Sequence, residues 1–107
     1  MNSALKKLSE IVAEANDVFD ACHKSIDTVL GIMDKVLRKQ GINADAVTID
    51  CISLNKKIVF LMHDDKPEIV DIALGNKEGD IQSSSAYNLN TLSIAMVIGI
   101  MEDNFLY

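Results

Sequence analysis

The chain has 107 residues, which is enough for one hydrophobic core and leaves little room for a second, so we expect a single domain over residues 1–107. A hydrophobic content of 49% excludes a disordered chain, and the excess of 16 Asp and Glu over 10 Lys and Arg argues against a nucleic-acid binder, which needs clustered cations. Cys22 and Cys51 do not form a CxxC motif, and no apolar run approaches the roughly 20 residues of a membrane span. The sequence therefore predicts an acidic, cytoplasmic protein that binds neither nucleic acid nor membrane.

The first predicted element is a long amphipathic helix over residues 1–40. Apolar residues recur there in alternating steps of three and four, with the charged residues on the opposite side. The apolar positions are Leu5, Leu8, Val12, Ala15, Phe19, Cys22, Ile26, Val29, Met33 and Val36. The cations Arg38 and Lys39 followed by Gly41 are typical of a helix C-terminus.

The length of this helix raises the question of what covers it. It would be about 55 Å long, whereas a compact domain of this size is roughly 35 Å across. Either the chain breaks into a helical hairpin, at residues 15–17 or 24–27, or the helix stays whole and a second subunit covers the excess. We favour the whole helix, because a loop would usually disturb the heptad phase, and this interpretation predicts a homodimer. Its predicted interface residues are Leu5, Leu8, Val12, Phe19, Ile26, Met33 and Met96.

Residues 46–75 predict a β-meander. Three segments rich in Val and Ile are separated by turn residues, which is typical of short antiparallel strands. The segments span about 47–53, 57–63 and 68–74. The middle segment is apolar on both sides, with Phe60 on one and Leu61 on the other, which indicates a sheet covered on both faces. The later stretch QSSSAYN is interpreted as a loop.

The last predicted element, over residues 88–104, is apolar nearly all round. Its length and a polar cap at Asn90 favour a helix, whereas Gly99 and the β-branched residues beside it would suit a buried strand. Either structure needs cover on every side. The predicted fold class is therefore α+β: a long N-terminal helix, a three-stranded antiparallel meander and a C-terminal apolar helix or buried strand, assembled as a dimer.

A polar cluster follows the middle strand, where His63, Asp64, Asp65 and Glu68 fall close together. His and carboxylate side chains are typical of divalent-metal and acid–base sites. Asp residues and Pro67 are equally typical of an exposed turn between strands, where neighbouring side chains point apart. We favour the turn, and we expect no catalytic residue, no metal and no cofactor here.

The two cysteines and two histidines of the chain are residue types that bind zinc. Cys22 and His23, taken with Cys51 and His63, would supply four ligands. Adjacent residues on a helix point about 100° apart, however, so Cys22 and His23 do not face one ion. We expect Cys22 to pack as a small apolar residue instead.

These patterns favour a non-catalytic, self-associating interaction module of adaptor, chaperone-like or inhibitor-like type, acting as a homodimer with a protein partner. The wide apolar face of the first helix and the apolar last segment carry this hypothesis. The alternative is a small-molecule-binding protein or simple enzyme, with a pocket between the sheet and the C-terminal helix. Asp50, His63 or Asp71 would then lie at the mouth of the pocket.

Overall fold

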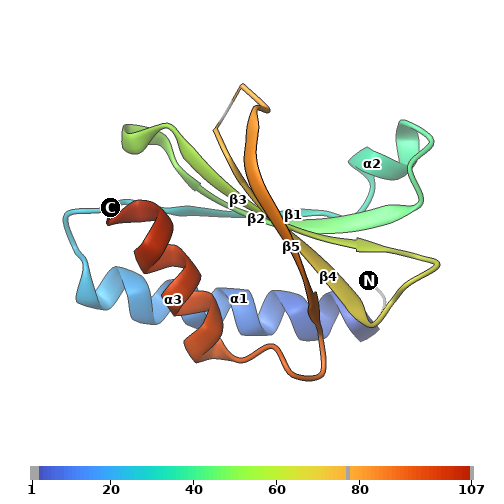
Figure 1. Cartoon of the computed structure of the whole chain (residues 1–107), viewed down its shortest axis with the longest axis horizontal. Coiled ribbons are helices and arrows are strands. Elements are labelled where there is room, and N and C mark those ends of the chain that lie inside the picture. Colours follow the sequence, from blue (N-terminus) through green and yellow to red (C-terminus); the bar gives the residue numbers. More distant parts are fainter. Residues whose placement is uncertain (1–2, 77, 107) are drawn as a thin grey trace.

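The computed structural model describes residues 3–76 and 78–106, in which α1 and α3 pack on one face of a five-stranded antiparallel sheet (Figure 1). The elements in chain order are α1 (Ser3–Cys22), β1 (Val29–Met33), α2 (Val36–Lys39), β2 (Ala44–Cys51), the 3-10 turn η1 (Ile52–Leu54), β3 (Lys56–His63), β4 (Ile69–Gly75), β5 (Ile81–Asn88) and α3 (Ile94–Phe105). The strand order is β1-β2-β3-β4-β5, so every strand pairs with its neighbours in the sequence. The short α2 contacts β2 and lies apart from the other two helices.

The predicted three-stranded meander is wrong, because the sheet has five strands. The three predicted strands correspond to β2, β3 and β4, and the predicted α+β class holds. β1 is added at one edge by residues assigned to the long helix, and β5 is added at the other edge by the segment interpreted as a loop.

The predicted helix over residues 1–40 is also wrong. α1 ends at Cys22, and the chain then turns through residues 24–27, which was one of the two candidate break points, but it continues as a strand and not as a second helix. The segment after the turn, VLGIM, contains β-branched residues and Gly31, which favour strand over helix. Its apolar residues continue the heptad phase of α1 although they belong to another element.

The core lies between the sheet and the two long helices. α1 contributes a stripe of fully buried residues at helical spacing, and alternate residues of β2, β3 and β4 face it. The buried residues on these elements are Leu5, Leu8, Val12, Ala15 and Phe19 from α1, and Val47, Ile49, Ile58, Phe60, Val70 and Ile72 from the sheet. The predicted apolar face of the first helix is therefore covered by the chain's own sheet.

The last segment forms a helix, so the helical alternative is confirmed. α3 is capped by Ser93, whose hydroxyl accepts a hydrogen bond from the backbone N–H of Met96 at 3.1 Å, and not by Asn90 as predicted. Its buried residues Val97, Met101 and Phe105 complete the core. The rings of Phe105 and Phe19 meet edge to face, with centroids 5.9 Å apart, which joins α3 to α1.

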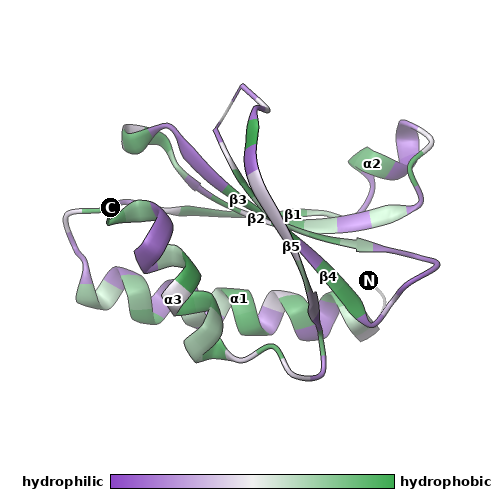
Figure 2. Ribbon diagram, in the orientation of Figure 1, coloured by the Kyte–Doolittle hydropathy of each residue, from purple (hydrophilic) through white to green (hydrophobic). Residues whose placement is uncertain are grey.

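The other face of the sheet carries no long helix in the described part of the chain, and we call it the open face. Because side chains alternate along a strand, it is formed by the residues between the core positions. On β2, β3 and β4 these residues are Ala44, Ala46, Thr48, Asp50, Lys57, Val59, Leu61, His63, Ile69, Asp71, Ala73 and Gly75, of which Ala44, Ala46 and Thr48 are buried. Val59 and Leu61 are only half-buried, and apolar residues occur along the strands as well as on the helices (Figure 2).

Candidate functional site

Arg38 joins two acidic residues at one end of the sheet. It lies in α2, a single helical turn that is followed by Gly41 with a left-handed φ of 84°. Its Nε and Nη2 atoms donate to the carboxylate of Asp45 at 3.1 and 3.0 Å. Its Nη1 and Nη2 atoms donate to Asp64 at 2.7 and 2.8 Å. Both contacts are bidentate, the geometry in which a guanidinium binds a carboxylate most strongly.

The two carboxylates of this ion-pair cluster differ in burial. Asp45 in β2 is 4% exposed, whereas the side chain of Asp64 in the β3–β4 turn is 47% exposed. The hydrogen bonds from Arg38 hold the pKa of Asp64 below its ordinary value, and the positive charge of Arg38 acts in the same direction. The hydrogen bonds to Asp64 and Asp45 in turn raise the pKa of Arg38. Arg38 and Asp64 therefore keep their charges at neutral pH, and the hydrogen bonds from Arg38 hold α2 against the sheet.

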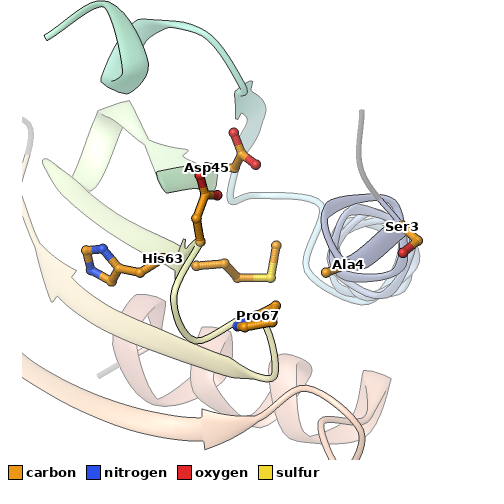
Figure 3. A pocket seen from close by; sticks show the side chains of 7 residues that line it. Ser3, Ala4, Asp45, His63 and Pro67 are labelled. Carbon is orange, nitrogen blue, oxygen red and sulfur yellow. The ribbon is translucent and has the colours of Figure 1, made fainter. Parts of the chain in front are cut away.

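A cavity of about 250 Å³ lies beside this cluster (Figure 3). It is lined by Ser3, Ala4, Asp45, Met62, His63, Asp64 and Pro67. The ring of His63 points away from the side formed by Ser3 and Ala4 (Figure 3). The two carboxylates at the cavity are already bound to Arg38, so they are not available as a pair of ligands for a cation.

The polar cluster predicted from the sequence does not converge. Asp64 turns to Arg38, whereas Asp65 and His63 line a separate hollow on the open face. Glu68 is exposed, and its backbone carbonyl accepts a hydrogen bond from the N–H of Leu89 at 2.7 Å. Within residues 3–76 and 78–106, no three His, Cys, Asp or Glu side chains are arranged to hold a metal ion.

The cysteines and His23 are also separated. Cys22 is exposed at the end of α1, contrary to the prediction that it packs as an apolar residue, and Cys51 is buried in the core. Cys22 is exposed because α1 ends there and no longer follows the sheet. The ring of His23 contacts the ring of Phe19 in a tilted arrangement, with centroids 4.7 Å apart and an interplanar angle of 45°. Its Nε2 atom lies 3.5 Å from a carboxylate oxygen of Glu102.

The predicted pocket between the sheet and α3 is small. A groove of about 150 Å³ runs there between α3 and the last two strands, lined by Ile72, Leu74, Ser83, Ser85, Tyr87, Ile100 and Asp103. Pockets for small molecules usually measure about 300–1,000 Å³. Asp50, His63 and Asp71, expected at its mouth, lie on the open face, so the sheet separates them from this groove.

Most predicted interface residues are not on the surface of the folded chain. Leu5, Leu8, Val12 and Phe19 are 0% exposed, Ile26 and Met33 are half-buried, and Met96 is 37% exposed. The helical overhang that predicted a dimer is absent, because α1 has 20 residues. A second subunit would therefore have to contact other surfaces.

β5 is a surface that the sequence did not indicate. It forms an edge of the sheet and carries no charged residue over its eight positions, IQSSSAYN. Seven of these residues are exposed, and Tyr87 is half-buried. A strand exposed on both faces has no apolar alternation, which is why the pattern did not reveal it. The ion pairs of Arg38 with Asp45 and Asp64 were likewise not predicted, because contacts between distant segments leave no local pattern in the sequence.

Comparison of the chain with known family models, with characterised proteins and with solved structures finds no significant match. In the described residues, no helix combines the length and the apolar character needed to cross a bilayer.

Proposed function

We propose that this chain is a non-catalytic interaction module that acts as a homodimer. The observation that carries the proposal is that α1 and α3 pack on one face of the sheet, whereas within the described residues the β5 edge is unpaired and the centre of the open face carries no long helix. Bare sheet edges with unpaired backbone groups readily pair with another chain. As part of the same proposal, the protein acts in the cytoplasm, the location predicted from the sequence.

The open face supports the second part of the proposal, a protein partner. Its centre on β3 is apolar, with Val59 and Leu61, and it is bordered by Asp50 and Asp71. Asp50 is paired across the strands with Lys57, whose Nζ lies 3.8 Å from a carboxylate oxygen. An apolar centre within a charged border is the usual composition of a protein contact surface.

The small-molecule alternative has less support. A hollow of about 560 Å³ on the open face is large enough for a small molecule, but of its lining residues, His63, Asp65, Lys66, Ile69, Asp71 and Ala86, only Ile69 and Ala86 are apolar, whereas small-molecule pockets are lined predominantly by apolar side chains. The carboxylates at the 250 Å³ cavity are bound by Arg38. These two sites therefore support a ligand site less than the open face and the β5 edge support a contact surface.

The mass of the protein in solution tests the proposal. We expect light scattering coupled to gel filtration to give twice the 11.7 kDa of one chain at micromolar concentration. The concentration should be varied over two orders of magnitude, because a weak dimer dissociates on dilution. A mass of one chain at every concentration would contradict the proposal.

A further inference from the structure

The β5 edge lacks the features that usually prevent strands from pairing between molecules. Edge strands of monomeric proteins tend to be short, or to carry Lys, Pro, a covering loop or an inward-pointing charge. β5 has eight residues and contains neither a charged residue nor proline. The opposite edge, β1, is shorter, with five residues.

The direction of the backbone groups of β5 follows from the register. The N–H of Leu89 donates to the carbonyl of Glu68 at 2.7 Å, so these two form a hydrogen-bonded pair next to the end of the β4–β5 ladder. Because hydrogen-bonded pairs alternate along antiparallel strands, Ser83, Ser85 and Tyr87 direct their backbone groups to β4.

The residues between them direct their N–H and C=O groups away from the sheet. These are Ser84 and Ala86, followed by Asn88. The carbonyl of Asn88 already accepts hydrogen bonds from the N–H groups of Thr91 and Leu92, at 3.1 and 3.0 Å. Ser84 and Ala86 thus offer complete pairs of donor and acceptor to a further strand.

We infer that β5 pairs in antiparallel orientation with β5 of a second copy of this chain, around a two-fold axis at Ser85. This inference rests on the proposed function, since it names the contact through which the homodimer forms. Ser84 of each copy faces Ala86 of the other, and each of the two pairs exchanges two hydrogen bonds. The two five-stranded sheets then join into one continuous sheet.

The side chains of β5 suit this register. Ser85 faces Ser85 of the second copy, and Ser83 faces Tyr87 of the second copy. Both serines and Tyr87 line the groove beside α3, so the ring of the second copy's Tyr87 lies at this groove. A second copy is the matching partner because all paired positions are uncharged and the facing serine side chains are small, so antiparallel pairing places no charged or bulky side chains directly opposite one another on the two strands.

The position of Ser85 on the axis allows a test by charge exchange. We expect Ser85→Lys and Ser85→Glu each to halve the measured mass, because each variant places like charges directly opposite one another. An equimolar mixture of the two should recover the dimeric mass, because Lys then faces Glu. Ile52→Lys, at a 67% exposed position away from β5, should leave the wild-type mass unchanged.

Cysteine cross-linking provides a second test that does not depend on charged variants. In a Cys22→Ser background, Ser85→Cys should form a disulfide between copies on mild oxidation, because facing residues of a non-hydrogen-bonded pair have Cα atoms about 4.5 Å apart. Ser83→Cys is the matched control, since the two copies of residue 83 are separated by about 13 Å along the strands.

The outcomes separate this inference from the proposed function. If the wild type is dimeric and the Ser85 charge variants also remain dimeric, the dimer stands and the β5 contact is overturned. If both variants are monomeric and their mixture stays monomeric, or if Ser83→Cys cross-links as well as Ser85→Cys, the axis at Ser85 is overturned. A monomeric wild type overturns both proposals.

Discussion

Asp64 is held in its charged form by two hydrogen bonds from Arg38, and this has a consequence for acid stability. A carboxyl group whose pKa is lower in the folded chain than in the unfolded chain stabilises the fold above its unfolded pKa of about 3.9. That stabilisation is lost as the pH falls through the folded pKa. The ion pair therefore stabilises the fold at neutral pH, and this stabilisation is lost in acid.

We predict that Asp64→Asn reduces the pH dependence of stability. The free energy of unfolding of the wild type, measured by urea titration between pH 6 and pH 2, should fall more steeply below about pH 4 than that of the variant. Asp17→Asn is the control, because Asp17 is an exposed acid on α1 that does not contact Arg38, and it should retain the wild-type slope. Equal slopes for wild type and Asp64→Asn would contradict the assignment.

Thr28 shows how single residues hold the turn between α1 and β1. Its Oγ1 atom lies 2.6 Å from Oδ1 of Asn16 and 2.7 Å from Oδ1 of Asp20. The Thr28 hydroxyl is the donor, and its one hydrogen is shared between the two acceptor oxygens. The nearly buried Asn16 is thereby paired, and the residue before β1 is tied to the second half of α1.

At the scale of elements, substitution of two glycines by alanine should change the free energy of unfolding in opposite directions. A Cβ atom at Gly31 in β1 would lie 2.8 Å from Oγ1 of the buried Thr48, whereas a Cβ atom at Gly99 in α3 would meet no atom within 4 Å. We expect Gly31→Ala to lower the free energy of unfolding by roughly 1 kcal/mol through overpacking. Gly99→Ala should raise it by about 0.5–1 kcal/mol, because alanine favours a helix interior.

Chemical denaturation of the two variants measures both changes, and each variant serves as the control for the other. The same substitution is made in a strand and in a helix, so a common effect on the unfolded chain cancels in the comparison. A stability of Gly31→Ala equal to or above that of Gly99→Ala would show that β1 does not approach β2 as closely as described.

The elements that were predicted from the sequence are those with one covered face. In β2 and β4 the apolar residues alternate because one side of each strand faces the core, and the same contrast revealed the start of α1. β3 is apolar on both sides, which predicted cover on both faces, but its outer residues Val59 and Leu61 are only half-buried. β5 is exposed on both sides and β1 carries apolar residues in helical phase, so neither gave a strand pattern. The polar turn after β3 was expected, but its partner Arg38 was not, because the two are 26 positions apart in the chain.

At the scale of the whole molecule, the two long helices α1 and α3 lie on one side of the sheet. A two-fold axis perpendicular to the sheet keeps equivalent faces on the same side of the dimer. Pairing through β5 would therefore place both open faces side by side, with two copies of Val59 and Leu61 on one broad surface. A protein partner would meet this doubled surface while the helical layers stay on the far side.

We predict that the thermal stability of the wild type depends on its concentration. A dimer that unfolds to single chains is stabilised by mass action, so the Tm should rise as the concentration increases from about 1 to 100 µM. The Tm of Ser85→Lys should stay constant over the same range. Differential scanning calorimetry measures both, and a wild-type Tm that does not change with concentration would contradict a folded dimer in equilibrium with unfolded chains.

The contact between α1 and α3 links the two ends of the described chain, and this determines the order in which the core is completed during synthesis. The ribosome delivers α1 first and α3 last, with the five strands between them. The strands can pair one after another as they emerge, because each pairs with its neighbour in the sequence. Phe19 obtains its partner ring only when Phe105 has left the exit tunnel. A nascent chain stalled before residue 94 would therefore leave uncovered the part of α1 that packs against α3, including Phe19.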